Sequence, residues 1–235
     1  MTLEEIMKAL EEMGTEQTKN TFLRHGAKEP FFGVKIGDLK KLVKYVKKDQ
    51  ELALALFHTG NSDAMYLAGL SINSKLMTKN QIDQWAKEAG WYMIAECIVG
   101  AVAAESNYAL ELAREWMQSE DEIIENCGWS TYTHYLSITP DDNLDLDEVR
   151  KLLSNVEENI HKSKNRVRYT MNNFVIAAGS FVPSLTVEAM HVAKKIGKVN
   201  VDVGDTACKV PLASDYIEKI EAKGRLGVKK KTCIC

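Results

Sequence analysis

The sequence has little proline and no long apolar run. Its 235 residues include 4 prolines, at positions 30, 140, 183 and 211, so long stretches are free of the residue that most disrupts helices. No apolar run approaches the roughly 20 residues that a membrane span needs. The first six residues are acidic and amphipathic, unlike a signal peptide. We therefore expect no membrane partner.

Cysteine is present but sparse, and its arrangement argues against a disulfide-rich secreted protein. The five cysteines are odd in number and mostly far apart. A disulfide framework normally shows an even number of cysteines in a short chain. We expect a reducing, cytoplasmic location for this chain.

The common signatures of catalysis and metal binding are also missing. The chain has no P-loop, no G-x-G-x-x-G, no H-E-x-x-H, no G-x-S-x-G and no paired C-x-x-C. Its 5 histidines show no metal-ligand spacing, so we predict no metal site.

Charge is unevenly distributed along the chain. Residues 1–50 carry 10 basic and 8 acidic side chains, residues 51–160 carry 6 and 19, and residues 161–235 carry 14 and 6. A basic final third on an acidic body indicates a one-sided surface for a polyanion. The alternative interpretation is a solvated basic tail.

Helical periodicity dominates what is present. Leu3, Ile6 and Leu10 begin an amphipathic pattern, and capping boxes precede two helices, Thr2 with Glu5 and Thr78 with Gln81. The spacing predicts about a dozen helices of roughly 8–16 residues. The clearest cover residues 3–13, 36–46, 52–57, 65–76, 78–89, 91–102, 108–117, 122–136, 149–156, 167–178 and 187–196. Only residues 199–203 alternate as an extended segment would.

Short helices with short connections predict an all-α fold of the HEAT/armadillo-like kind, a right-handed α-α superhelix of helical pairs. A compact orthogonal bundle is the alternative. The domain boundary is expected after residue 197, with residues 198–235 as a C-terminal extension ending in a basic tail. Because solenoids present a concave face to extended partners, duplex nucleic acid or another protein is the expected partner.

Two stretches carry side chains suited to chemistry. Tyr92 and Glu96 are four residues apart, so one helix face offers an aromatic ring beside a carboxylate, suited to a cationic base or developing positive charge. A tyrosine at the core edge beside a solvated glutamate is the simpler alternative. Lys162, Arg166 and Asn173 can share a second face that suits phosphates. The glycine-broken basic tail, residues 223–231, could lie along a nucleic-acid backbone or be disordered.

At these stretches the chain resembles the DNA alkylation repair family, the AlkD-like HEAT-repeat alkylpurine DNA glycosylases. Three segments carry the resemblance: residues 31–42, where Phe31, Gly33 and Val34 precede a basic helix; residues 90–96; and residues 164–179. The similarity spans most of residues 1–195 in order and spacing, without an invariant motif. It is specific for the fold and weaker for the activity.

The resemblance implies duplex DNA as partner and hydrolysis of the N-glycosidic bond of N3- or N7-alkylated purines, with no metal or organic cofactor. It makes Glu96 the carboxylate that stabilises the oxocarbenium-like sugar, with Tyr92 and Trp91 against the lesion. Residues expected to contact DNA are Lys40, Lys44, Lys164, Arg166, Arg168, Phe174, Lys229, Lys230 and Lys231.

The chain departs from the family pattern at four positions. Glu96 stands where active members have aspartate, Tyr92 and Phe174 where they have tryptophan, and Asn126 to Gly128 where an arginine contacts the backbone. A carboxylate displaced by about 1 Å can lose on the order of a hundredfold in rate.

Three hypotheses follow. A base-excising enzyme requires Glu96, Tyr92 and Trp91 in the concave groove, with Arg166 and Arg168 nearby. A non-catalytic binder of distorted or branched DNA requires a basic groove and a buried, ion-paired or misdirected Glu96. A protein-interaction solenoid requires an apolar or acidic concave face.

Overall fold

The structure is a computed structural model that describes residues 1–234, and within them it contains helices and no strand, which confirms the all-α prediction. The α-helices are α1 (Leu3–Met13), α2 (Glu16–Arg24), α3 (Ile36–Val46), α4 (Gln50–His58), α5 (Ser62–Ser71), α6 (Lys79–Glu88), α7 (Tyr92–Ile94), α8 (Gly100–Glu105), α9 (Ala109–Trp116), α10 (Glu122–Ile138), α11 (Leu146–Asn159), α12 (Asn165–Phe181), α13 (Thr186–Ile196) and α14 (Ala213–Ala222). Short 3₁₀ turns and one π-helical turn, Ala95–Val99, connect some of them.

Local capping fixes where many of these helices begin. Both predicted capping boxes are present, Thr2 with Glu5 at α1 and Thr78 with Gln81 at α6, and each satisfies amides that the first helical turn leaves unpaired. The helix predicted from residue 65 begins earlier. Asn61 caps it by accepting hydrogen bonds from two amides, and the helix ends at Ser71 before a separate 3₁₀ turn.

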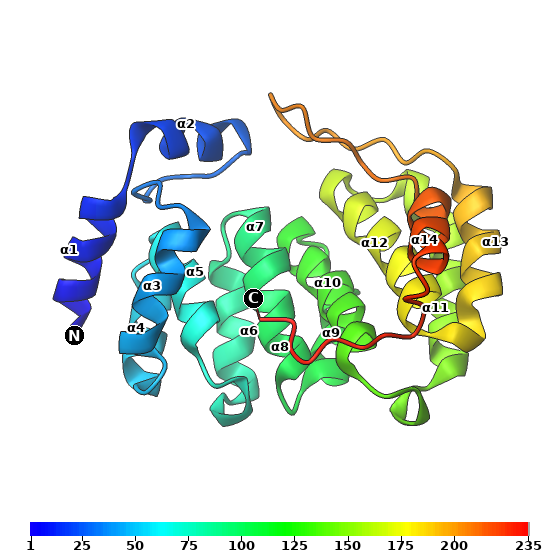
Figure 1. Ribbon diagram of the computed structural model, residues 1–235, viewed down its shortest axis with the longest axis horizontal. Coiled ribbons are helices and arrows are strands. Elements are labelled where there is room, and N and C mark those ends of the chain that lie inside the picture. The colour runs from blue at the N-terminus through cyan, green and yellow to red at the C-terminus, as the bar shows by residue number, and fades with distance from the viewer. Residues whose placement is uncertain (235) are drawn as a thin grey trace.

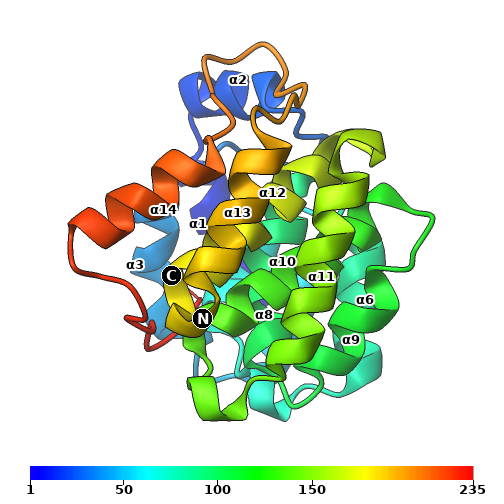
Figure 2. The same cartoon turned by 90° about the vertical axis from the view of Figure 1, so that its right-hand side faces the viewer.

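The helices stand side by side along the long axis of the molecule, from α1 at one end to α13 at the other (Figure 1). One apolar core joins residues of α1 and of α3 to α9 with the first part of α10, and a second joins α10 to α11, α12, α13 and α14. Helix α10 belongs to both cores and therefore connects the two halves of the array. Seen along that axis, α11 and α13 lie next to each other, with α14 on another side (Figure 2).

No single helix within residues 1–234 is long and apolar enough to cross a membrane. Helices Asn165–Phe181 and Pro183–Ile196 pass that test only as a pair, and the pair is bent by 114°.

The chain after α13 folds back over the array. Residues 197–212 carry no regular structure and run from α13 towards α2 (Figures 1 and 2). Gly204 has a φ of +73°, and a Cβ at this position would lie 2.6 Å from the Arg24 carbonyl oxygen, so the close approach to the end of α2 requires glycine. The alternating residues 199–203 form no strand. The Asn165 side chain instead holds Asp202 through two hydrogen bonds, of 2.7 and 2.9 Å.

The basic tail is ordered, which excludes the disordered alternative. Its backbone donates hydrogen bonds from Gly227 to the Ser180 carbonyl (2.9 Å) and from Lys230 to the Ser137 carbonyl (2.8 Å). Cys233 is buried against α8. Residues 223–234 thus lie along the protein's own helices.

Candidate functional site

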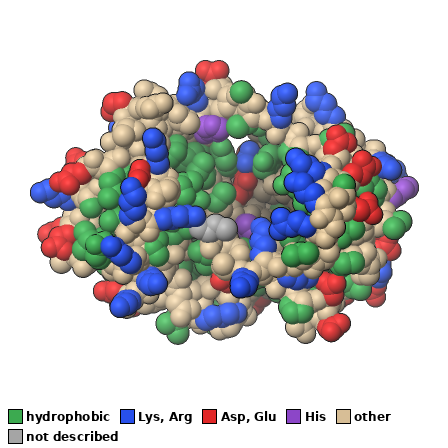
Figure 3. Space-filling view, in the orientation of Figure 1, with side chains coloured by type: hydrophobic (Ala, Val, Ile, Leu, Met, Phe, Trp, Pro, Cys, Tyr) green, Lys and Arg blue, Asp and Glu red, His purple; other side chains and the backbone are tan. Residues whose placement is uncertain are grey.

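A cavity of about 330 Å³ lies where α7, α10 and α12 meet, and the folded-back extension lines it as well. Figure 3 shows a hollow in the middle of this face, with lysine and arginine side chains around it. The residues that line the cavity are His25, Tyr92, Met93, Glu96, Cys97, Ser130, Thr133, His134, Arg166, Tyr169, Thr170, Asn173, Val203, Cys208 and Lys209. We call this cavity the central pocket.

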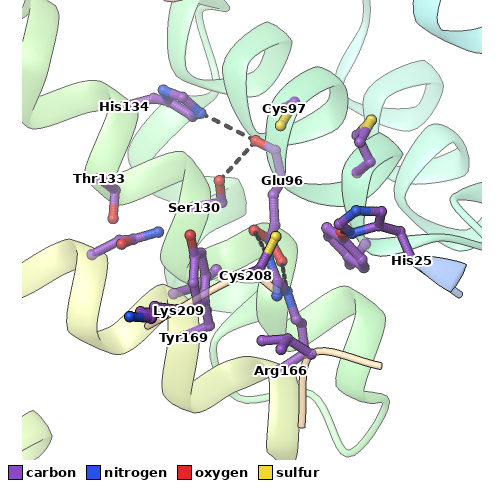
Figure 4. Close-up of a pocket in the computed structure, with 15 residues that line it drawn as sticks. His25, Glu96, Cys97, Ser130, Thr133, His134, Arg166, Tyr169, Cys208 and Lys209 are labelled. Carbon is purple, nitrogen blue, oxygen red and sulfur yellow. Dashed lines mark hydrogen bonds and ion pairs between the residues drawn. The ribbon is translucent and has the colours of Figure 1, made fainter. Parts of the chain in front are cut away.

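Glu96 enters the pocket from an irregular part of its helix. After the single turn Tyr92–Ile94, residues Ala95–Val99 form a π-helical turn. Such turns are rare and recur at functional sites. The Glu96 carbonyl accepts hydrogen bonds from the Ser130 hydroxyl (2.8 Å) and from His134 Nε2 (3.1 Å). Two side chains of α10 therefore stabilise the irregular turn (Figure 4).

The Glu96 carboxylate is fully engaged by other side chains. Arg166 donates from Nε to Glu96 Oε1 and from Nη2 to Oε2, the second at 2.9 Å, in a two-pronged ion pair. The Asn126 amide donates to Oε1 at 2.7 Å and accepts at its own oxygen from the Thr170 hydroxyl at 2.8 Å. Only 7% of Glu96 is exposed. The carboxylate is therefore buried and neutralised.

The Arg166 guanidinium is itself enclosed between two aromatic rings. Its central carbon lies 3.8 Å from the ring centroid of Tyr92 and 4.0 Å from that of Tyr169. Arginine suits this place because its flat guanidinium stacks on rings while its edge binds a carboxylate. The Tyr92 hydroxyl lies 3.0 Å from His25 Nδ1. Burial raises the pKa of both tyrosines, so they stay neutral hydrogen-bonding groups.

His134 behaves as a neutral side chain in this pocket. Burial lowers its pKa to about 4, although its hydrogen bond to the Glu96 carbonyl favours the charged form. Within residues 1–234, no group of three His, Cys, Asp or Glu side chains is placed to hold a metal ion.

The structure separates the three residues that were expected to act on a lesion. Tyr92 and Glu96 line the same pocket. Trp91 does not, because its ring is buried against Phe22, and its Nε1 donates to the His25 carbonyl at 2.8 Å. Trp91 thus lies outside the central pocket, although it lines a neighbouring cavity with Tyr92 and Arg166, and its contact with a lesion stays a prediction.

Several predicted DNA contacts are already used inside the protein. Phe174 is completely buried, so its predicted contact with DNA is wrong. Lys164 pairs with Glu125 at 2.5 Å, and Lys229 pairs with Asp141 at 2.8 Å. Arg168 donates to the carbonyls of Ser163 and Asn200 and so anchors the start of the extension. Arg166 is held by Glu96, as described above. Arg166 is therefore not available to phosphates in this arrangement, whereas the Lys164 side chain is still 40% exposed in its ion pair.

The remaining predicted lysines stay exposed. Lys40 and Lys44 lie on α3 outside the central pocket, and Lys230 and Lys231 lie on the tail. Lys162 belongs to a 3₁₀ turn before α12, so the predicted three-residue face reduces to Arg166 and Asn173.

Some residues of the pocket have no signal in the sequence. Asn126 stands where the family pattern has an arginine, yet its amide binds Glu96. Lys209 and His25 belong to no motif, and both line the pocket. No local pattern could find them, because their neighbours in the pocket lie far away in the sequence.

Comparison with known proteins places this geometry in a family. The profile of the DNA alkylation repair enzyme family matches residues 6–198. An uncharacterized protein of Listeria monocytogenes is 35% identical over 225 residues, which cover 93% of this chain and 97% of the relative. An uncharacterized protein of Listeria innocua is 34% identical over the same shares.

A solved structure extends the comparison to the whole fold. It is described as a new family of proteins related to the HEAT-like repeat DNA glycosylases with affinity for branched DNA structures. It shares 36% sequence identity, covers 100% of both chains and superposes with a TM-score of 0.92. The fold is therefore the HEAT-like repeat fold, as the sequence predicts. The chain belongs to the DNA alkylation repair enzyme family.

Proposed function

We propose that this protein binds branched DNA in the groove around the central pocket and does not excise bases there. One observation carries the proposal: Glu96 is buried and bound through both oxygens by Arg166. The branched substrate is suggested by the solved relative that is described as having affinity for branched DNA structures.

The chemistry of excision explains why this ion pair matters. A glycosylase carboxylate must approach the sugar and stabilise positive charge that develops on it. At Glu96 that charge is already offset by a guanidinium, and the place between the Tyr92 and Tyr169 rings is filled. A cationic base would have to displace Arg166 from a carboxylate and two rings together. The geometry therefore favours the non-catalytic hypothesis.

The extension adds a cation to the edge of the central pocket. Val203, Cys208 and Lys209 line the central pocket from the chain that folds back towards α2. Lys209 is exposed and makes no ion pair within residues 1–234. Its ammonium is therefore free for a phosphate at the edge of the groove, where a backbone contact requires no access to Glu96.

Binding is tested by fluorescence anisotropy on a four-way junction and on a linear duplex of the same sequences. We expect tighter binding to the junction and a steep loss of affinity with salt, because phosphate contacts release counterions. Lys209→Gln should weaken binding and reduce the salt slope by about one. Lys219→Gln on α14, an exposed lysine outside the pocket, is the matched control and should bind as the wild type does. Equal affinity for junction and duplex would contradict the proposal.

Excision is tested by base release from duplex DNA that carries 7-methylguanine. Wild-type protein should release no more base than buffer does. Release that depends on protein concentration would contradict the proposal and restore the excision hypothesis, with Glu96 as its first candidate residue.

A further inference from the structure

A second cavity, of about 490 Å³, adjoins the central pocket. It lies between α12, α14 and the chain after α14, and we call it the α14 cavity. Thr133, Tyr169 and Asn173 line both cavities, so the two are direct neighbours. Its volume falls in the range of roughly 300–1,000 Å³ that is typical of small-molecule and cofactor sites. Neither the predictions from sequence nor the proposed DNA binding assigns it an occupant.

Aromatic and apolar surface makes up much of its wall. Tyr216 of α14 is 46% exposed, although it is a large ring on a helix packed against the array. Phe181 at the end of α12, which is half-buried, and Ile176 line the cavity with it. Aromatic rings in an apolar wall suit a flat, ring-shaped ligand, because such a ligand stacks on them.

The charge at this cavity has one sign. Arg225, Lys229 and Lys230 line it, and no aspartate or glutamate does. Lys229 is neutralised by Asp141, but within residues 1–234 Arg225 and Lys230 have no carboxylate partner. The Lys230 ammonium lies 5.6 Å from the ring centroid of Phe181. Cations therefore lie next to the aromatic wall, as a phosphate attached to a ring would require.

Polar groups without partners lie at the same place. The Ser180 hydroxyl is buried, lines the cavity and has no hydrogen-bond partner within residues 1–234. A buried polar group left unpaired destabilises the folded protein, so a ligand that bonds to it is favoured. The side-chain amide of Asn173, at the boundary of the two cavities, also makes no hydrogen bond among the described residues. A ligand with a polar ring edge would satisfy both groups.

We propose that the α14 cavity takes one unpaired nucleotide, with its base against Tyr216 and Phe181 and its phosphate at Arg225 and Lys230. The inference rests on the proposed binding of branched DNA and extends it. In a continuous duplex, removing a nucleotide from the stack costs a few kcal/mol, whereas an unpaired nucleotide at a branch is already out of it. The cavity would thus supply a preference for branches that carry unpaired nucleotides, such as forks, over linear duplex DNA.

The first test compares a fork that carries unpaired nucleotides with a fully paired duplex. Stacking on an aromatic side chain contributes about 1–3 kcal/mol per base, so Tyr216→Ala should reduce the preference for the fork by about 5- to 150-fold. Arg225→Gln should reduce it as well, with little effect on the duplex. Tyr45→Ala, an exposed tyrosine on α3, and Lys223→Gln, just after α14, are the matched controls and should keep the preference.

A second readout follows the nucleotide itself. 2-Aminopurine at the unpaired position should lose fluorescence when wild-type protein binds, and this change should be absent with Tyr216→Ala. A wild-type protein without preference for forks or junctions would contradict the proposed function. If Tyr216→Ala and Arg225→Gln both kept the preference for the fork, the α14 cavity would not be its source, while the proposed function would stand. The result that would assign the cavity to an apolar acid is stabilisation of the wild-type protein by decanoate but not by dAMP. That stabilisation would have to be absent in Tyr216→Ala.

Discussion

At the scale of single residues, the ion pair of Arg166 with Glu96 holds the pocket together. Removing one partner of a buried pair leaves an uncompensated charge, so Arg166→Met should lower the free energy of unfolding by about 3–5 kcal/mol. Urea unfolding measures this. The control is Arg114→Met, whose guanidinium is bonded to Glu148 but is half exposed and should cost less than about 1 kcal/mol.

The double variant Glu96→Gln with Arg166→Met separates charge from packing. The neutral amide can keep its hydrogen bond to Asn126, so this variant should be more stable than Arg166→Met alone. An Arg166→Met protein as stable as Arg114→Met would show that the pair does not hold Glu96 in place.

His134 gives a prediction about pH. Its pKa is lowered from 6.5 to about 4 in the folded protein, mainly by burial. Below pH 6.5 the unfolded chain takes up a proton that the folded chain refuses, so this stability is complete above pH 6.5 and is lost as the pH falls towards 4. The loss is at most about 3 kcal/mol. Between pH 8 and pH 4, the free energy of unfolding should fall less steeply in His134→Gln than in the wild type. Equal slopes of unfolding free energy against pH would contradict the prediction.

At the scale of elements, two glycines in helices should respond to alanine with opposite signs. A Cβ at Gly128 of α10 would lie 2.6 Å from the Met117 backbone nitrogen, which follows α9 directly and cannot move aside. Gly128→Ala should therefore destabilise the protein by about 1–3 kcal/mol. Gly37 of α3 has no atom within 4 Å of its Cβ position, so Gly37→Ala should stabilise by about 0.5–1 kcal/mol. Thermal unfolding of both variants checks the signs, and a neutral Gly128→Ala would argue against the tight contact of α9 with α10.

The sequence predicts the helices of this protein better than it predicts the side chains of the site. Helix starts could be read because their signals lie within three residues, as for Thr78 and Gln81. The site could not be predicted in the same way, because the side chains that bind Glu96 are distant in the sequence. Asn126 lies 30 residues away and Arg166 lies 70 residues away. Tyr92 and Glu96 line one pocket, as their spacing predicts, but the π-helical turn Ala95–Val99 that contains Glu96 has no sequence signal. Phe174 was expected at the DNA because a helix pattern does not say which of two neighbouring faces is buried.

At the scale of the whole molecule, the acidic middle of the chain joins neighbouring helices. Lys79 of α6 pairs with Glu111 and Glu115 of α9, and Arg114 of α9 pairs with Glu148 of α11. Further pairs, Arg150 with Glu188 and Lys195 with Glu157, join α11 to α13. Many of these carboxylates therefore form ion pairs within the array. This does not favour the protein-interaction hypothesis, in which the acidic residues bind a partner.

The tail joins the C-terminal end of the array to helix α8 in its middle (Figure 1), and this contact can be tested by thiol chemistry. Residues 226–234 run from α14 back towards α8 (Figure 1). There Glu105 Oε1 accepts hydrogen bonds from the Thr232 hydroxyl (2.5 Å) and the Cys233 amide (2.7 Å). Cys233 is 5% exposed, and burial raises the pKa of its thiol. We expect slow alkylation of Cys233 by iodoacetamide in the wild type.

Glu105→Ala removes both hydrogen bonds, so the tail should open more often while the rest of the array stays folded. Two lost hydrogen bonds of about 1 kcal/mol each correspond to alkylation of Cys233 faster by roughly 10- to 30-fold, read at this residue by tandem mass spectrometry. Cys127 inside α10 is completely buried and serves as the internal control, since only global unfolding exposes it. An unchanged rate at Cys233 would mean that Glu105 does not hold the tail. Equal acceleration at Cys127 would mean that the tail and the array unfold as one cooperative unit.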